Sequence, residues 1–158
     1  MLSNKEEYSS VPKSIELLFE NEKLELMKVL CLIYSISLES KRYIPISEIL
    51  FYYSLTNFNL ISIFEETNEA TSPNLFFRFQ SRIGNIVIQM ENLNFIKLKA
   101  SLATKNENIK IKVSKTGQSF YEEHNSAFFQ ELQQKYISTF AKVSYNASTL
   151  KKLKEGKG

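Results

Sequence analysis

The sequence predicts a mainly helical protein with one small β-hairpin, an α+β fold. Two observations lead to this prediction. Apolar residues recur with the helical period of 3.6 along most of the chain, and between residues 95 and 114 the period changes to two. Hydrophobic residues make up 43% of the 158-residue chain and aromatic residues 13%, which is enough to build a core without disulfides or metals.

The first predicted helix covers residues 14–37. Its apolar residues recur three or four positions apart, and glutamate and lysine lie between them. They are Leu17, Leu18, Leu24, Met27, Leu30, Ile33 and Tyr34. Further apolar residues widen this arc in the second half of the helix, so we expect that half to be buried on most sides.

A second, shorter helix is predicted to begin at Pro45-Ile46-Ser47-Glu48. Ser47 can cap its first turn, and Ile49, Leu50 and Phe51 follow as apolar residues. The mixed segment behind it, residues 56–74, is expected to be a connection.

A third main helix is predicted over residues 75–93. Thr71-Ser72-Pro73 precedes it, and proline near the first turn is typical of a helix start. Gly84 lies inside it and weakens it by about 1 kcal/mol relative to alanine, so we expect this glycine to permit close packing. The apolar arc of this helix consists of Leu75, Phe76, Phe79, Ile83, Ile86, Val87 and Met90.

The clearest local signal is a β-hairpin over residues 95–114. Residues 95–102 alternate between apolar and mostly basic side chains, as do residues 109–114, and the segment 103–108 between them is rich in turn residues. One face of the hairpin is therefore apolar and the other basic. An isolated hairpin is marginal in water, so we expect the first and third helices to cover the apolar face.

Helices are predicted again after the hairpin. Thr116-Gly117-Gln118 is expected to break the second strand, a short helix to begin over residues 119–123, and a longer helix to cover residues 126–143. Three helices followed by a two-stranded wing form a winged helix-turn-helix arrangement. We therefore predict a winged-helix-like core followed by C-terminal helices.

The domain limits follow from these elements. Residues 1–13 are expected to be a flexible N-terminus and residues 14–145 a single winged-helix-like domain. Residues 146–158 contain four lysines and two glycines, so they are expected to be a frayed basic tail.

The chain shows no catalytic, metal-binding or cofactor motif. His124 is its only histidine and lies beside Glu122 and Glu123, where we expect it to be solvated. The sequence has no Cys/His cluster with zinc spacing and no EF-hand loop, and its four glycines are too scattered for a P-loop or a dinucleotide fingerprint. We therefore expect no enzymatic activity, no cofactor and no small-molecule substrate.

The sequence also favours a cytoplasmic location. No stretch approaches the roughly 20 apolar residues of a membrane span, so no membrane partner is expected. The polar segment 1–10 does not resemble a secretory signal. A lone cysteine, Cys31, cannot form an internal disulfide, which suits a reducing compartment.

Charge is distributed unevenly along the chain. Residues 1–69 contain six Lys and Arg against eleven Glu, a balance of −5, whereas residues 70–158 contain fourteen against six, a balance of +8. Such a split suggests two faces with different partners, one of them anionic. An ordinary solvated surface in a lysine-rich protein is an equally weighted alternative.

The predicted hairpin is the main candidate for an anion-binding surface, because residues 95–115 contain six lysines and one glutamate. Lysines neutralise phosphates without reading bases, so we expect non-specific, salt-sensitive contact with double-stranded DNA. Lysines on edge strands also prevent aggregation, which is the alternative explanation. With two arginines one turn apart on the third helix, the DNA-binding candidates are Lys97, Lys99, Lys105, Lys110, Lys112, Lys115, Arg78 and Arg82.

An apolar stretch in the connection before the third helix, with one phenylalanine of that helix, is the candidate protein interface. Exposed, these residues would mark a binding surface, and buried packing is the preferred alternative for the connection. The candidates are Phe58, Leu60, Ile61, Phe64 and Phe77.

The order of segments resembles the middle components of ABC-three-component systems over residues 20–143. One departure lies at Leu93-Asn94-Phe95-Ile96, where such proteins often have a glycine before the first wing strand. The resemblance rests on Leu24-Glu25-Leu26-Met27-Lys28-Val29-Leu30, Pro45-Ile46-Ser47-Glu48-Ile49-Leu50-Phe51-Tyr52-Tyr53, the stretch from Arg78 through Phe95-Ile96-Lys97 and the hairpin, Thr116-Gly117-Gln118-Ser119-Phe120, and Ser126-Ala127-Phe128-Phe129-Gln130-Glu131-Leu132.

This resemblance implies a small winged-helix-like subunit found with an SMC/Rad50-like ATPase and an effector, often a nuclease, in bacterial anti-phage systems of the Lamassu type. It implies a non-catalytic accessory role: binding the ATPase near its head or neck, helping to hold the effector in check, and contacting DNA through the basic wing. The alternative is a stand-alone, dimeric winged-helix transcriptional regulator. A regulator would usually carry more arginine and polar residues on its recognition helix.

Overall fold

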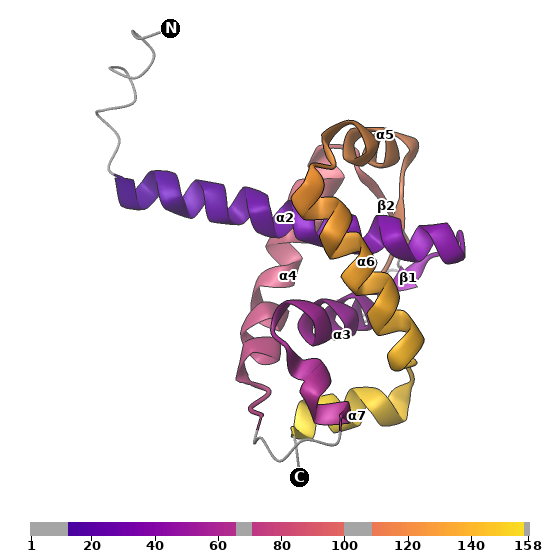
Figure 1. The fold of residues 1–158 in the computed structure, drawn as a ribbon. Helices are drawn as coiled ribbons and strands as arrows, with labels where there is room; N and C mark the ends of the chain where they lie inside the picture. The colour runs from indigo at the N-terminus through magenta and orange to yellow at the C-terminus, as the bar shows by residue number, and fades with distance from the viewer. Residues whose placement is uncertain (1–12, 66–70, 100–108, 157–158) are drawn as a thin grey trace, which may run out of the picture.

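The computed structural model describes residues 13–65, 71–99 and 109–156, with side chains described from residue 20 onward. Within these residues the chain forms six α-helices and one three-stranded antiparallel sheet, which confirms the predicted mainly helical α+β class (Figure 1). The strands are β1 (Ile44–Pro45), β2 (Ile96–Lys99) and β3 (Lys110–Val113). The helices are α2 (Lys13–Glu39), α3 (Ile46–Asn57), α4 (Asn74–Asn92), α5 (Lys115–His124), α6 (Ala127–Lys142) and α7 (Ala147–Glu155), with a 3-10 helix η1 (Leu60–Phe64).

Helix α2 is the central element of the fold. Its 27 residues span about 40 Å at 1.5 Å per residue. Its second half, where Val29, Leu30 and Ile33 are fully buried, contacts α3, α5, α6 and strand β3, as the widened apolar arc predicted. Its N-terminal half extends beyond the other helices in Figure 1, and residues 20–24 are all exposed.

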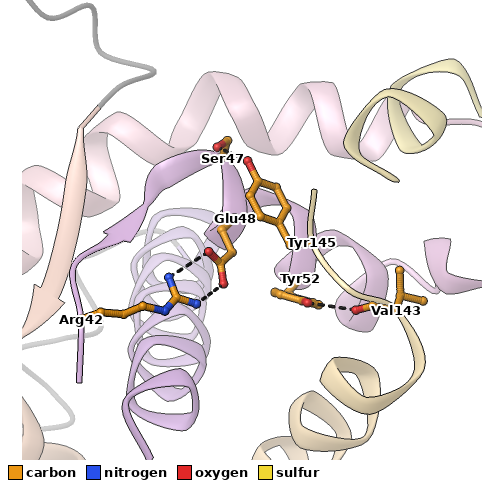
Figure 2. Close-up of polar contacts among 6 residues, drawn as sticks. All are labelled: Arg42, Ser47, Glu48, Tyr52, Val143 and Tyr145. Atoms are coloured by element: carbon orange, nitrogen blue, oxygen red, sulfur yellow. Dashed lines mark hydrogen bonds and ion pairs between the residues drawn. The ribbon is translucent and has the colours of Figure 1, made fainter. Parts of the chain in front are cut away.

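Helix α3 is buried along nearly its whole length, and aromatic residues fix its position. The Tyr53 ring stacks on Phe79 of α4, with ring centroids 4.0 Å apart and planes 6° from parallel. The Tyr52 hydroxyl donates a hydrogen bond of 2.9 Å to the carbonyl of Val143, just after α6 (Figure 2). The expected cap was wrong: Pro45 occupies the N-cap position, and the Ser47 hydroxyl bonds to the Tyr145 hydroxyl instead.

Helix α4 ends in a left-handed residue. Asn94 has φ 63°, and its N–H donates to the carbonyl of Glu91, while the N–H of Phe95 donates to the carbonyl of Met90, both at 2.9 Å. This is the hydrogen-bond pattern of a Schellman motif, whose left-handed position accepts glycine or asparagine. Asn94 therefore occupies a helix-ending position that glycine often takes.

Strands β2 and β3 form the predicted antiparallel hairpin, with Leu98 opposite Ile111. Helix α2 contacts β3 and α4 contacts β2, so the predicted cover of the apolar face is confirmed. The sheet has a third strand that was not predicted, because β1 pairs with β3 and gives the order β1-β3-β2. The predicted turn at residues 103–108 lies outside the described residues.

Strand β3 ends at Val113, before Thr116-Gly117-Gln118, but the predicted helix start at residue 119 is wrong, because these three residues already lie in the first turn of α5. Ser114 caps this helix, and its Oγ accepts a 3.0 Å hydrogen bond from the N–H of Gly117. A Cβ at Gly117 would lie only 2.1 Å from the carbonyl oxygen of Phe95. Glycine is thus required here by the close approach of α5 to the hairpin, and it does not end the element.

The C-terminal segment forms a helix where the sequence predicted a frayed tail. The side chains of Asn146 and Thr149 each bond to the other residue's backbone N–H, which makes a capping box at the start of α7. Leu153 is fully buried, and α7 contacts η1. This apolar anchor and the cap stabilise residues 147–155 despite their lysine content.

Candidate nucleic-acid interface

Four predicted residues come together on one face of the hairpin. Lys97 lies directly opposite Lys112, and Lys99 lies directly opposite Lys110. Side chains on neighbouring strands are roughly 5 Å apart and those two positions along a strand roughly 7 Å apart, so the four amines share one small surface. We call this set of four residues the lysine face.

Tyr43 completes the lysine face, and the sequence did not single it out. It immediately precedes β1, in which Ile44 pairs with Ile111 in the antiparallel sense. Tyr43 therefore lies next to Lys112 on the neighbouring strand. The amines of Lys99 and Lys112 lie 5.5 and 5.7 Å from the centre of its ring, within the range of cation–π attraction.

A partly buried ion pair fixes the segment that carries Tyr43. Arg42 donates two hydrogen bonds, of 2.6 and 3.1 Å, to the carboxylate of Glu48 in the first turn of α3 (Figure 2). The Glu48 side chain is only 9% exposed, and its hydrogen bonds raise the pKa of Arg42. A bidentate pair between arginine and carboxylate restricts geometry more than a lysine pair would. We therefore assign Arg42 to positioning Tyr43.

The lysine face concentrates positive charge on one small surface. Like charges directly opposite each other on paired strands are destabilising by some tenths of a kcal/mol per pair. None of the ion pairs among the described residues involves Lys97, Lys99, Lys110 or Lys112. An external polyanion would relieve this repulsion, and a duplex would also release counterions.

The remaining DNA-binding candidates are dispersed. Lys115 is exposed at the start of α5, and Arg78 is exposed on α4. Arg82 is already paired, because its guanidinium donates to the carboxylate of Glu25 at 2.8 and 3.2 Å. Lys105 lies outside the described residues. The structure therefore brings four of the eight candidates together as the lysine face, and the sequence contained no short-range signal of the Arg82 pair.

The protein-interface candidates divide in the same way. Leu60 is buried, and Phe58, Ile61 and Phe64 are partly buried against the core, as the alternative explanation held. Phe77 is 42% exposed on α4, so it alone of the five offers a large free surface. Ile88, which is 57% exposed on the same helix, was not among the candidates. Its position outside the predicted apolar arc was a signal in the sequence that it would be exposed.

Potentially reactive groups take part in packing contacts. His124 hydrogen-bonds through Nδ1 to the carbonyl of Phe120 at 2.8 Å and stacks on the Phe120 ring. Burial raises the pKa of the Cys31 thiol to about 11, so this group is protonated at neutral pH. Within the described ranges, no group of three or more His, Cys, Asp or Glu side chains could hold a metal ion.

Two further findings concern the whole of the described chain. No helix among residues 13–65, 71–99 and 109–156 is long and apolar enough to cross a membrane. Comparison with known proteins gives no matching family model, curated protein or solved structure.

Proposed function

We propose that this chain is a non-catalytic, cytoplasmic accessory subunit of a bacterial anti-phage defence complex of the Lamassu type. In this role it binds an SMC/Rad50-like ATPase and an effector subunit with nuclease activity. It also contacts double-stranded DNA, without sequence specificity, through the lysine face. The resemblance of residues 20–143 to middle components supports the choice of complex.

The order of elements supports a winged-helix-like core. The chain runs α2, β1, α3, α4, β2 and β3, and β1 pairs with β3 so that β2 forms the far edge of the sheet. Helix–strand–helix–helix–strand–strand is the order that a helix-turn-helix with a hairpin wing requires. In such a fold α4 would be the second helix of the helix-turn-helix, and β2 with β3 would be the wing.

The lysine face is the observation that carries the DNA contact. Its amines come from lysine, a flexible point charge that neutralises phosphate but reads bases poorly. Helix α4 exposes Arg78 and several amide side chains, but its Arg82 is paired to Glu25, and the large apolar residues Phe77 and Ile88 are exposed on the same helix. This composition favours a subunit that touches DNA non-specifically and binds protein over a regulator that reads an operator.

The DNA contact is tested with a charge-reversal pair of variants. In one, the four residues of the lysine face are changed to Glu. In the control, four exposed lysines elsewhere are changed to Glu, which gives the same net charge of +3 − 8 = −5. The control positions are Lys23, Lys135, Lys142 and Lys151.

Binding is measured by fluorescence anisotropy with a mixed-sequence 30-base-pair duplex at 50 and 200 mM salt. Four phosphate contacts predict that the wild-type affinity falls by roughly 100-fold across this range, from a slope of about −0.9 per contact. We expect the lysine-face variant to lose this salt-dependent binding and the control to retain most of it. Equal loss in the two variants would show that only net charge matters.

The subunit assignment is tested by purifying the tagged chain from its native host and identifying what co-purifies by mass spectrometry. Recovery of a large coiled-coil ATPase with a second effector protein, at fixed stoichiometry, is the expected result. Recovery of the chain as a dimer with one discrete DNA sequence would instead establish a regulator.

A further inference from the structure

An open apolar groove lies between α3, α4, the hairpin and α7. Its volume is about 530 Å³, and every one of these four elements contributes an apolar side chain to its wall. The main apolar contributions are Leu50 from α3, Val87 and Ile88 from α4, Leu98 and Ile109 from the hairpin, and Leu150 from α7.

Helix α4 presents one exposed stripe, in which Ser81, Gly84 and Ile88 line the groove and Phe77 lies beyond its lining. Phe77, Ser81, Gly84 and Ile88 follow one another at spacings of four, three and four residues, which places them on one face of the helix. All four are exposed, with Phe77 and Ile88 as large apolar side chains at the two ends and two small residues between them. A second helix or strand could therefore pack along this stripe.

Gly84 makes no close packing contact with the described part of its own chain. A Cβ added there would have no described atom within 4 Å, so the expectation that Gly84 permits close packing within the domain is wrong. Glycine inside a helix costs about 1 kcal/mol relative to alanine. Close approach of an external backbone would account for this residue, because helices come nearest where the side chains between them are smallest.

The walls of the groove favour a helix as its occupant. They are built mainly from the sides of helices, whose backbone groups are bonded internally, and from one face of the hairpin, in which β2 is the edge strand. An extended peptide lying along the helical walls would leave its own N–H and C=O groups without partners there, whereas a helix satisfies them internally. A helix with apolar residues three or four positions apart also matches the stripe on α4.

The charge of the residues at the groove indicates the sign of the charge expected on the occupant. Lys154 of α7 is the one charged residue among the described residues that line the groove, and it is exposed. No carboxylate lines the groove in the same set. We infer that the groove binds an amphipathic helix of a partner protein, with its apolar side in the groove and a carboxylate facing Lys154. This inference rests on the proposed role as a subunit of a complex.

A matched set of variants tests the groove without unfolding the domain. Gly84→Trp fills the groove from a position that faces open space, and Lys154→Glu reverses its charge. The bulk control is Asn92→Trp, an exposed position on α4 that does not line the groove. The charge control is Lys151→Glu, one turn before Lys154 on α7.

Each tagged variant is purified from the native host, and co-purifying subunits are quantified against wild type. We expect Gly84→Trp and Lys154→Glu each to lower recovery of one partner by roughly tenfold or more, since blocking a central contact removes most of a local interaction. The two controls should stay within about twofold of wild type. Full recovery with Gly84→Trp overturns the groove inference and leaves the proposed function intact, whereas a wild-type chain that recovers no subunit overturns both.

Photo-crosslinking identifies the occupant. With benzoylphenylalanine at position 88, we expect crosslinks to a glutamate- or aspartate-rich amphipathic helix of the same partner, and a charge-reversed residue in that helix should restore binding to Lys154→Glu. Crosslinks to a second copy of this chain, to a basic or extended segment, or to a co-purified small amphiphile would each overturn the inference.

Discussion

Replacing Gly117 by alanine should lower the free energy of unfolding by about 2 kcal/mol. The added Cβ would lie 2.1 Å from the carbonyl oxygen of Phe95, at least 0.9 Å inside the 3.0 Å limit of real Cβ contacts. Relieving such an overlap between two backbones costs about 1–3 kcal/mol. The same oxygen accepts a 2.9 Å hydrogen bond from the N–H of Ser114, and losing it costs about 1 kcal/mol more. The better helix propensity of alanine offsets about 1 kcal/mol.

The assay is thermal and urea unfolding followed by circular dichroism, with Gly84→Ala as the matched control. The same substitution meets no described atom within 4 Å at Gly84, so it should stabilise the protein by about 0.4–1 kcal/mol. For a chain of this length, the midpoint temperature should fall by about 4–8 °C in Gly117→Ala and rise by about 1–4 °C in Gly84→Ala. A Gly117→Ala protein that unfolds at or above the wild-type temperature would refute the close approach of α5 to the hairpin.

Two further predictions concern buried side chains. Leu153→Ala should lower the free energy of unfolding by about 2–5 kcal/mol in urea titrations, because this fully buried residue anchors α7, and an unchanged midpoint would mean that α7 is not docked. The Cys31 pKa rises from 9.0 to about 11 on folding, so the folded state favours the protonated thiol. The contribution of this thiol to the free energy of unfolding is therefore fully present below pH 9 and is lost as pH rises from 9 to 11. That loss amounts to about 2–3 kcal/mol, and stability in Cys31→Ala should decline less steeply over this range.

Elements with strong local periodicity could be predicted from the sequence. Helices α2, α4 and α6 and the hairpin each carry enough apolar repeats to show their period and their buried face. Strand β1 could not be found, because two residues are too short to show alternation and Ile44 is held by pairing with Ile111. Helix α7 was not predicted, because its lysines suggested a frayed tail, although Asn146 and Thr149 have the spacing of a helix capping box.

The candidate site was predictable only as far as it is local. Alternation along the hairpin placed the four lysines on one face before their register was known. Tyr43 lies beside these lysines because β1 pairs with β3, a strand about 65 residues away in sequence. Arg82 is not available as a DNA contact because it pairs with Glu25, 57 residues away. Such contacts depend on how the helices pack, and a single sequence contains no local signal for them.

The two proposed binding surfaces use opposite sides of the same strands. Side chains alternate along a strand, so Leu98 faces the groove while Lys97 and Lys99 face the other side. A partner helix in the groove and a duplex on the lysine face therefore need not compete, and one chain can hold both at once. This arrangement suits a subunit that links a protein complex to DNA. Competition between the partner and DNA for the chain would mean that one of the two surfaces has been assigned to the wrong side of the hairpin.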